Sequence, residues 1–265
     1  MNKWIVGARP RTLPAAIAPV LVATALAASD ADIPMAALAL LVSLSLQVGV
    51  NYANDYSDGI KGTDDNRVGP TRLVASGLAS AKSVKQAAFL SFAIAAVVGS
   101  ILALQSSLWL LAVGAAAIFA AWTYTGSKRP YGYLGLGEIS VFIFFGVVAT
   151  MGSYFVQTEL ITWQSFIVSI PMGALACAIL AINNLRDRAQ DELVGKRTLA
   201  VRLGDAGARK LFISLLVLAH VAAISIPSEN TLITLALLPQ TVIISNQVRK
   251  GASGAALIPL LGKTG

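Results

Sequence analysis

The sequence has 265 residues, of which 56% are hydrophobic and only 12% are charged. Soluble domains carry about 25% charged residues, so this composition excludes an ordinary soluble protein and indicates a chain that crosses a membrane several times. The formal net charge of +7 could suggest nucleic-acid binding, but in membrane proteins positive charge usually collects in the loops of one side.

Hydropathy predicts eight membrane-spanning helices separated by short polar breaks. They are expected at residues 12–28, 34–54, 84–104, 108–125, 137–156, 163–185, 208–226 and 230–246. The basic start of the chain resembles a secretory signal, but Pro14 and Pro19 interrupt its apolar centre and favour a transmembrane helix. The apolar fragment within residues 251–265 is too short to cross a bilayer. We therefore expect one all-α membrane domain over residues 1–265.

All 20 Lys and Arg residues fall on one side of this eight-helix arrangement. They lie before the first span, in residues 55–85, 126–136 and 186–210, and after residue 246. The opposite loops carry only acidic charges, at Asp30, Asp32, Glu159 and Glu229. The positive-inside rule then places the N-terminus and the basic loops in the cytoplasm of a multi-pass membrane protein. No nucleic-acid partner is needed to explain the net charge.

The stretch over residues 51–77 puts a polar stripe directly behind the second predicted span. Asn51, Asn54, Asp55 and Asp58 have the spacing i, i+3, i+4 and i+7, which places them on one face if the helix continues that far. Carboxylates one turn apart repel each other unless a cation separates them, and Mg²⁺ binds such groups while leaving positions for water and phosphate. The stretch therefore predicts a magnesium half-site, with a solvated loop as the alternative.

A second polar stripe follows the sixth span, where Asn183, Asp187 and Asp191 are spaced i, i+4 and i+8. Each stripe leads into a basic segment that contains glycine, which suggests a short internal duplication. Two Mg²⁺ would balance four carboxylates, so a bound diphosphate would need further cations. The adjoining loops offer Lys61, Arg72, Arg129, Lys196 and Arg197. A prenyl diphosphate would place its head at these loops and its apolar tail among the helices.

Four motifs in order carry a resemblance to a known family. They are N-D-Y-x-D-x-x-x-G-x-D over residues 54–64, G-P-x-R-x-V-x-S-G over 69–77, RPYGYLGLGE over 129–138, and N-N-x-R-D-x-x-x-D with G-K-R-T-L-A-V-R-L-G within 183–204. Together with RPRTL at residues 9–13 they resemble the UbiA superfamily of intramembrane aromatic prenyltransferases. Within it they most resemble the branch that prenylates 1,4-dihydroxy-2-naphthoate in menaquinone synthesis.

This resemblance implies nine helices around a central cavity capped by the charged loops, and the ninth helix is not apparent in the sequence. It implies Mg²⁺-dependent transfer of a polyprenyl group from polyprenyl diphosphate to dihydroxynaphthoate, with loss of CO₂ and diphosphate, giving demethylmenaquinol. Gly62 stands where many ubiquinone-branch relatives carry an aspartate. Asp64 is expected to serve instead, which favours the naphthoate branch over a 4-hydroxybenzoate acceptor.

Residue roles follow from the motifs and the resemblance together. We expect Asp55, Asp58 and Asp64 to bind one Mg²⁺ and Asp187 and Asp191 to bind the other, with Arg72 completing the catalytic set. The five loop cations would neutralise the departing diphosphate. The expected acceptor contacts are Asn51, Asn54, Tyr131 and Asn184, with Arg9 or Arg11 for its carboxylate. Helix capping and headgroup anchoring are alternative roles for these side chains.

Two other classes remain open from the sequence. A CDP-alcohol phosphotransferase also carries metal-binding aspartates at a membrane face, and the run from Asp55 to Gly59 resembles the start of its motif, but the Ala-Arg and the nearby second Asp pair are absent. A secondary transporter of anions would explain polar helix ends, but it would place its charged sites nearer the midplane.

Overall fold

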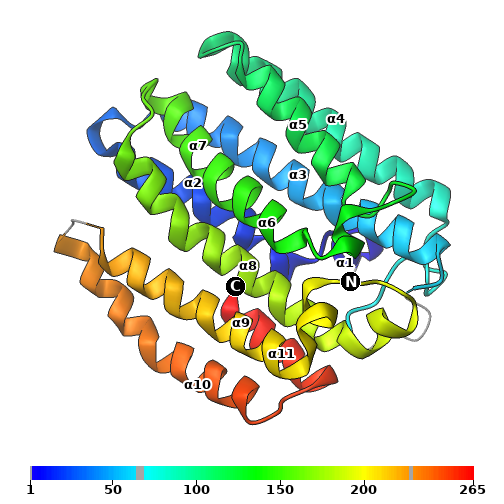
Figure 1. The fold of residues 1–265 in the computed structure, drawn as a ribbon. Coiled ribbons are helices and arrows are strands. Elements are labelled where there is room, and N and C mark those ends of the chain that lie inside the picture. The colour runs from blue at the N-terminus through cyan, green and yellow to red at the C-terminus, as the bar shows by residue number, and fades with distance from the viewer. Residues whose placement is uncertain (1, 64–68, 227–228) are drawn as a thin grey trace.

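A computed structural model describes residues 2–63, 69–226 and 229–265, and over these residues the chain forms helices and no strands. The elements are α1 (Lys3–Ala8), η1 (Pro10–Thr12), α2 (Pro14–Ala27), η2 (Ala28–Asp30), α3 (Ile33–Ile60), α4 (Ala81–Gln105), α5 (Leu110–Thr123), η3 (Tyr131–Leu134), α6 (Gly137–Val141), η4 (Phe142–Val148), α7 (Ala149–Thr158), α8 (Trp163–Leu193), α9 (Leu199–Ile224), η5 (Glu229–Leu237), α10 (Leu238–Arg249), η6 (Gly254–Ala256) and α11 (Leu257–Thr264). The long helices run side by side in one bundle (Figure 1).

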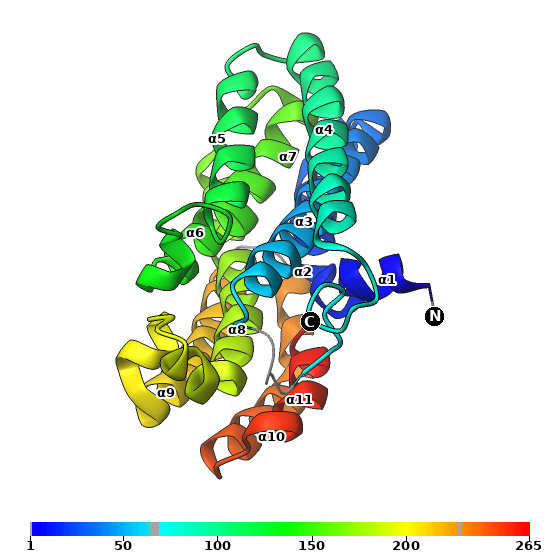
Figure 2. The same ribbon diagram turned by 90° about the vertical axis from the view of Figure 1, so that its right-hand side faces the viewer.

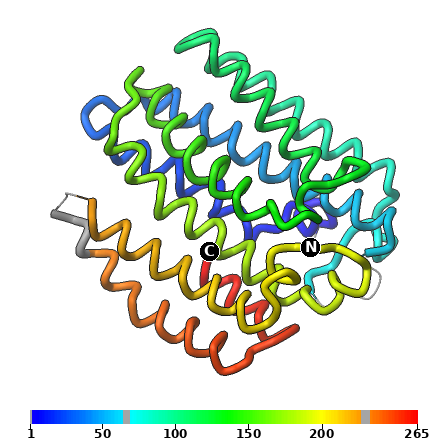
Figure 3. The backbone as a smooth tube through the Cα atoms, viewed as in Figure 1, coloured from blue at the N-terminus to red at the C-terminus, as the bar shows by residue number. Residues whose placement is uncertain are grey.

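The bundle has a layered order that both ribbon views show. The α4 and α5 helices form one flank, α9 and α10 form the other, and α2, α3 and α8 lie between them (Figures 1 and 2). The connections that follow α3, α5 and α8 gather at one end of the bundle (Figure 3). Since these connections carry the predicted basic loops, the expected collection of charge on one side is reflected in the fold.

Five helices in the described residues are long and apolar enough to cross a membrane, among them α3, α4, α8 and α9. The fifth is the continuous helix Gly137–Thr158, and the bent pair Lys3–Thr12 with Pro14–Asp30 would make a sixth span. The chain bends by 54° between the two halves of that pair. The segment Leu110–Thr123 is a shorter apolar helix. The all-helical membrane bundle is confirmed, while the number of eight spans stays a prediction.

The α3 and α8 helices both continue beyond the apolar runs from which their spans were predicted. Asp32 caps the start of α3 by accepting a hydrogen bond from the Met35 amide at 2.9 Å, and Thr162 forms a capping box at the start of α8. The α3 helix ends at Ile60, six residues beyond its predicted end, and α8 ends at Leu193, eight residues beyond. The two polar stripes are therefore helical, as the site prediction requires.

The segment after α10 forms the short helix α11, which packs into the bundle. Leu257, Leu260 and Leu261 of α11 are buried in one core with residues of α8, α9 and α10. The Gln240 side chain donates a hydrogen bond to the Lys263 carbonyl at 2.8 Å. With eight residues, α11 is about 12 Å long, so it covers part of α8 without crossing a bilayer.

The helix from Gly137 to Thr158 contains a π-helical segment, η4, in its middle. Gly146 of η4 faces α8 so closely that a Cβ atom there would lie 2.5 Å from the Cα of Gly173. Glycine at both positions permits this approach of the two backbones. The wide turn places Phe144, Phe145 and Val148 on the wall of the central cavity.

Candidate active site

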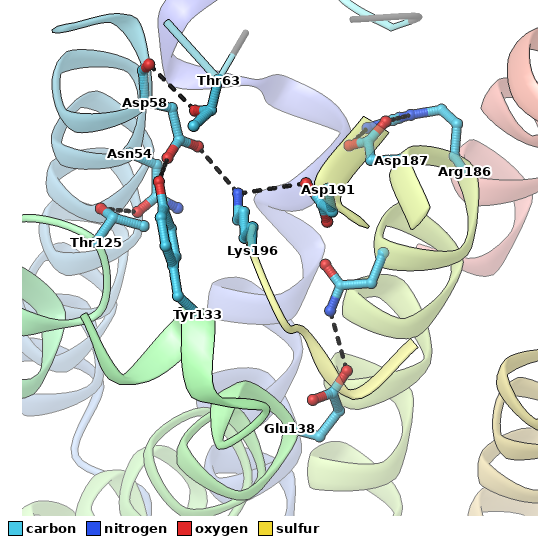
Figure 4. Close-up of polar contacts among 11 residues, drawn as sticks. Asn54, Asp58, Thr63, Thr125, Tyr133, Glu138, Arg186, Asp187, Asp191 and Lys196 are labelled. Atoms are coloured by element: carbon cyan, nitrogen blue, oxygen red, sulfur yellow. Dashed lines mark hydrogen bonds and ion pairs between the residues drawn. The ribbon is translucent and has the colours of Figure 1, made fainter. Parts of the chain in front are cut away.

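The carboxylate of Asp58 lies at the loop end of α3 and contacts two other parts of the chain (Figure 4). The Tyr133 hydroxyl donates a hydrogen bond to Asp58 Oδ1 at 2.6 Å, and Lys196 Nζ lies 3.3 Å from Asp58 Oδ2. The Asp58 side chain is only 3% exposed. In a site this dry, charge-assisted contacts are stronger than they are at a surface.

Lys196 joins the first polar stripe to the second. Its ammonium lies 3.8 Å from Asp191 Oδ1, and its backbone amide donates a hydrogen bond to the Asp191 carbonyl at 2.8 Å. Asp191 is near the end of α8, whereas Asp58 is near the end of α3. The two predicted half-sites therefore meet, with one carboxylate of each beside the same ammonium.

The ring of Tyr133 contacts two of the predicted diphosphate-binding cations. Lys61 Nζ and Lys196 Nζ each lie 4.9 Å from its ring centroid, a cation–π distance. Burial, reinforced by the negative charge of Asp58, raises the pKa of the Tyr133 phenol. The hydroxyl therefore stays a hydrogen-bond donor at neutral pH. Tyr133 lies within the RPYGYLGLGE motif, but the sequence indicated no role for this residue.

Burial also affects Lys61, which follows the last residue of α3. Its ammonium donates a hydrogen bond to the Thr125 carbonyl at 2.8 Å. Partial burial lowers the pKa of Lys61 from the ordinary lysine value. Of the other predicted diphosphate ligands, Arg72 is half-buried, while Arg129 and Arg197 are exposed on the adjoining loops.

Asp187 is directed toward its neighbour in sequence. Arg186 donates two hydrogen bonds to it, from Nε to Oδ1 and from the second guanidinium nitrogen to Oδ2, both at 2.7 Å. The Arg186 side chain is 2% exposed and that of Asp187 is 13% exposed. In Figure 4 this pair lies on the side of α8 away from Asp58. A role for Asp187 in metal binding stays a prediction, and Arg186 is a partner that sequence reasoning did not name.

Asp55 differs from Asp58, although both lie at the end of the same helix. It is fully buried, and its two oxygens accept hydrogen bonds from the amides of Leu73 and Val74 at 2.8 and 2.9 Å. Asp64, the third aspartate predicted for this half-site, lies outside the described residues. Within the residues described, no three His, Cys, Asp or Glu side chains form a metal-binding cluster.

A cavity of about 280 Å³ extends along α3 from the loop end toward the opposite end of the bundle. Ala39 and Asn54 both line it, and they are separated by about 22 Å at 1.5 Å per helical residue. Its polar lining residues are Arg9, Thr12, Ser43, Gln47, Asn51, Asn54, Tyr124, Tyr131, Ser140, Ser153 and Asn183. Most of the remaining wall is aliphatic or aromatic, so the cavity suits a long apolar chain.

Three of the four predicted acceptor contacts line this cavity. Asn51 donates hydrogen bonds to the Ala8 carbonyl at 2.9 Å and to the Thr12 hydroxyl at 3.1 Å. Asn54 accepts one from the Thr125 hydroxyl at 2.7 Å. The Tyr131 hydroxyl donates to the Ala120 carbonyl at 2.9 Å. These contacts fix the three side chains on the wall before any ligand enters.

Arg9 also lines the cavity, whereas Arg11 does not line it. The Arg9 guanidinium donates a hydrogen bond to the Asn51 carbonyl at 3.1 Å. Its backbone is left-handed, with φ of 54°, a conformation rarely adopted by residues other than glycine. This turn joins α1 to η1 and directs the side chain toward α3.

The fourth predicted acceptor contact, Asn184, is directed elsewhere. Its amide donates a hydrogen bond to Glu138 Oε1 at 3.0 Å. Glu138 is 7% exposed, and its other oxygen has no hydrogen-bond partner among the described residues. A charged carboxylate buried within a membrane bundle is energetically costly, and the Asn184 amide offsets part of that cost by its hydrogen bond. The sequence did not predict that Asn184 and Glu138 form a pair.

Comparison with known proteins agrees with this geometry. The profile of the UbiA prenyltransferase family matches residues 16–251. The chain is 49% identical to the 1,4-dihydroxy-2-naphthoate octaprenyltransferase of Mycobacterium tuberculosis, with 99% of this chain and 91% of that protein covered. It is 37% identical to the Escherichia coli protein of the same name, with 98% and 89% covered.

A solved structure shares the fold. The UbiA homolog from Archaeoglobus fulgidus bound to GPP and Mg²⁺ matches with a TM-score of 0.69 and 13% identity, over 99% of this chain and 95% of that one. The bundle, the cavity and the paired polar stripes thus occur together with a family match over most of the sequence. The chain belongs to the UbiA prenyltransferase family.

Proposed function

We propose that this protein transfers a polyprenyl group from a polyprenyl diphosphate to 1,4-dihydroxy-2-naphthoate, giving demethylmenaquinol, diphosphate and CO₂. The observation that carries the proposal is an apolar cavity lined by Asn54, which lies one helical turn before Asp58 of the Asp58–Lys196–Asp191 cluster. The names of the relatives support the naphthoate acceptor. Membership of the family argues against the phosphotransferase and transporter alternatives.

The side chains at the loop end fit Mg²⁺. Asp58 and Asp191 supply hard oxygen donors, and both lie beside one ammonium, so the space between them suits positive charge. Together with Asp64 and Asp187 they are the residues that would hold the metal. Bound Mg²⁺ would supply positive charge to the diphosphate as it leaves.

The protein's own cations are also expected to stabilise the leaving diphosphate. Lys61, Lys196 and Arg72, with Arg129 and Arg197 on the rim, are expected to neutralise the diphosphate oxygens. The bond between the first prenyl carbon and the diphosphate oxygen breaks, and both electrons leave with the oxygen. The allylic cation that results must be kept from water, which the apolar cavity wall provides.

The acceptor is proposed to bind at the polar end of the same cavity. Asn51, Asn54 and Tyr131, which line the cavity, are expected to orient its hydroxyls, and Arg9, which also lines it, is expected to receive its carboxylate. The ring carbon that bears the carboxylate forms the new bond to the prenyl carbon, and the carboxylate leaves as CO₂. We propose that this loop end and the N-terminus face the cytoplasm, because the basic residues gather there.

One assay tests this function. The protein in lipid nanodiscs, given Mg²⁺ and farnesyl diphosphate, is offered dihydroxynaphthoate or 4-hydroxybenzoate, and products are identified by mass spectrometry. We expect a prenylated naphthalenediol that has lost the mass of CO₂. If only 4-hydroxybenzoate gave a product, the acceptor assignment would be wrong. If neither acceptor gave a product, the proposed function would be contradicted.

A further inference from the structure

Both oxygens of the Asp55 carboxylate accept hydrogen bonds from backbone amides of a loop that is distant in the sequence. Leu73 N donates to Oδ2 at 2.8 Å and Val74 N donates to Oδ1 at 2.9 Å, across 18 and 19 residues of sequence. The Asp55 side chain is buried with no measurable exposure. A buried carboxylate held by two amides is satisfied by the protein itself.

The packing around this contact shows that the loop is fitted to α3. A Cβ atom on Gly59, one turn beyond Asp55, would lie 2.6 Å from Val74 Cβ. A Cβ atom on Gly7 of α1 would lie 2.6 Å from Leu73 Cδ1, and Leu73 is fully buried. Two glycines therefore make room for the two residues whose amides bind Asp55.

The loop is also closed on itself beside the contact. The Ala79 amide donates to the Leu73 carbonyl at 3.0 Å, and the Ser76 amide donates to the Arg72 carbonyl at 3.1 Å. Gly77 takes a φ of 73°, which glycine adopts without strain. Arg72 directly precedes the two amides, so the position of its backbone is set by the Asp55 carboxylate.

Asp58 has a different environment only three residues later. Its oxygens face the side chains of Tyr133 and Lys196, which come from other connections of the same end. At 100° per residue, the two aspartates point about 60° apart around the helix. The two carboxylates of the first motif therefore face different neighbours.

We infer that Asp55 is a positioning residue that holds the Arg72 segment against α3, and that it is not a metal ligand. This inference departs from the metal role expected from sequence, and it rests on the proposed function for the part that concerns Arg72 and the diphosphate. Asp55 acts by fixing where the Arg72 guanidinium meets the leaving group. Replacement by asparagine would leave one acceptor and turn an NH₂ group toward the other amide.

The kinetic test compares Asp55→Asn with Asp58→Asn in nanodiscs. For Asp55→Asn we expect the KM for farnesyl diphosphate at saturating Mg²⁺ to rise about tenfold, and the Mg²⁺ concentration for half-maximal rate to change less than twofold. Asp58→Asn should shift the Mg²⁺ requirement strongly. A shift in Asp55→Asn as large as that in Asp58→Asn would overturn the inference. Asp30→Asn, in the opposite loop, is the control for loss of a carboxylate.

A double variant tests whether Asp55 acts through Arg72. If it does, Asp55→Asn combined with Arg72→Ala should have the same KM for farnesyl diphosphate as Arg72→Ala alone, because two residues of one unit are not additive. A further tenfold rise in the double variant would show an independent role and contradict the inference.

Limited proteolysis gives a readout that does not depend on catalysis. We expect trypsin to cleave after Arg72 about tenfold faster in Asp55→Asn than in the wild type, with cleavage after Arg249 unchanged and Asp58→Asn behaving as the wild type. Equal cleavage after Arg72 in Asp55→Asn and the wild type would contradict the inference. Because this measurement needs no substrate, absence of prenyl transfer by the wild type would refute the proposed function and leave the loop contact tested separately.

A second variant displaces the loop while it leaves every carboxylate in place. Gly59→Ala puts a methyl group against Val74, so it should raise the KM and the cleavage after Arg72 as Asp55→Asn does, with an unchanged Mg²⁺ requirement. This keeps the inference testable if Asp55→Asn fails to fold. Wild-type KM and cleavage in a folded Gly59→Ala protein would contradict it.

Discussion

Lys196 Nζ lies 3.3 Å from Asp58 Oδ2, although the two residues are 138 positions apart in the sequence. The contact ties the end of α3 to the connection between α8 and α9. Through it, the two polar stripes share one cation, and the first stripe adjoins the basic segment that follows the second. The geometry of the charged end therefore depends on this lysine.

Replacing Lys196 by methionine should lower the kcat/KM for prenyl transfer about 10²-fold, because the leaving diphosphate loses a cation in a dry site. The two carboxylates beside it would also repel each other. The rate is measured with farnesyl diphosphate in nanodiscs. Lys263→Met, an exposed lysine of α11, should keep the wild-type rate, and a wild-type rate in Lys196→Met would contradict the assigned role.

Tyr133→Phe removes one hydroxyl and keeps the ring beside Lys61 and Lys196. Asp58 then loses its hydrogen bond of 2.6 Å, and we expect kcat to fall about tenfold while the melting temperature changes by only a few degrees, since a hydrogen bond to a charged group contributes about 1.5–3 kcal/mol. Tyr133→Ala should lose more activity because it also removes the cation–π contacts. Equal activity in the two variants would show that the ring contributes nothing.

The binding of prenyl diphosphate should weaken at alkaline pH through Lys61. Burial lowers the pKa of this ammonium below the ordinary value of 10.5, so it loses its charge at a lower pH than a surface lysine does. The KM for prenyl diphosphate should therefore rise in the pH interval between the lowered pKa of Lys61 and the ordinary value of 10.5. Lys61→Arg should remove this part of the pH dependence because arginine stays charged.

The free energy of unfolding should rise over the same pH interval in which ligand binding weakens. Between the lowered folded pKa and the ordinary unfolded value, the unfolded chain binds more protons at Lys61, so this group makes stability rise with pH. Thermal unfolding measured beside the KM therefore separates loss of ligand binding from loss of structure. A KM profile identical in the wild type and Lys61→Arg would contradict the role of Lys61.

Val42→Trp should shorten the donor chain that the protein accepts. Val42 lies on the cavity wall formed by α3, three turns from Asn54, and a tryptophan there would fill the apolar end. We expect the kcat/KM for farnesyl diphosphate to fall at least tenfold relative to that for geranyl diphosphate. The ratio is measured by competition and product mass. Val97→Trp, at a lipid-facing position of α4 that is 63% exposed, should leave the ratio unchanged.

The sequence predicted those features that depend on composition and regular spacing. The membrane bundle followed from hydropathy, and the placement of Asp58 and Asp191 at one end followed from helical periodicity and the one-sided basic loops. Periodicity could not distinguish Asp55 from Asp58, because their difference lies in which distant groups meet them: two amides of one loop, or Tyr133 and Lys196. Glu138 was missed because nothing in its own segment indicates that Asn184 packs beside it.

The cavity has one consequence for the fate of diphosphate and the prenylated ring. Diphosphate carries its charge toward the basic loops and has no affinity for the aliphatic wall, whereas the prenylated ring keeps neither the diphosphate of the donor nor the carboxylate of the acceptor. We therefore expect the charged product to leave at the polar loop end and the prenylated product to leave along the apolar wall. A single chamber with one polar end sorts the products by phase, so departure of one need not wait for the other.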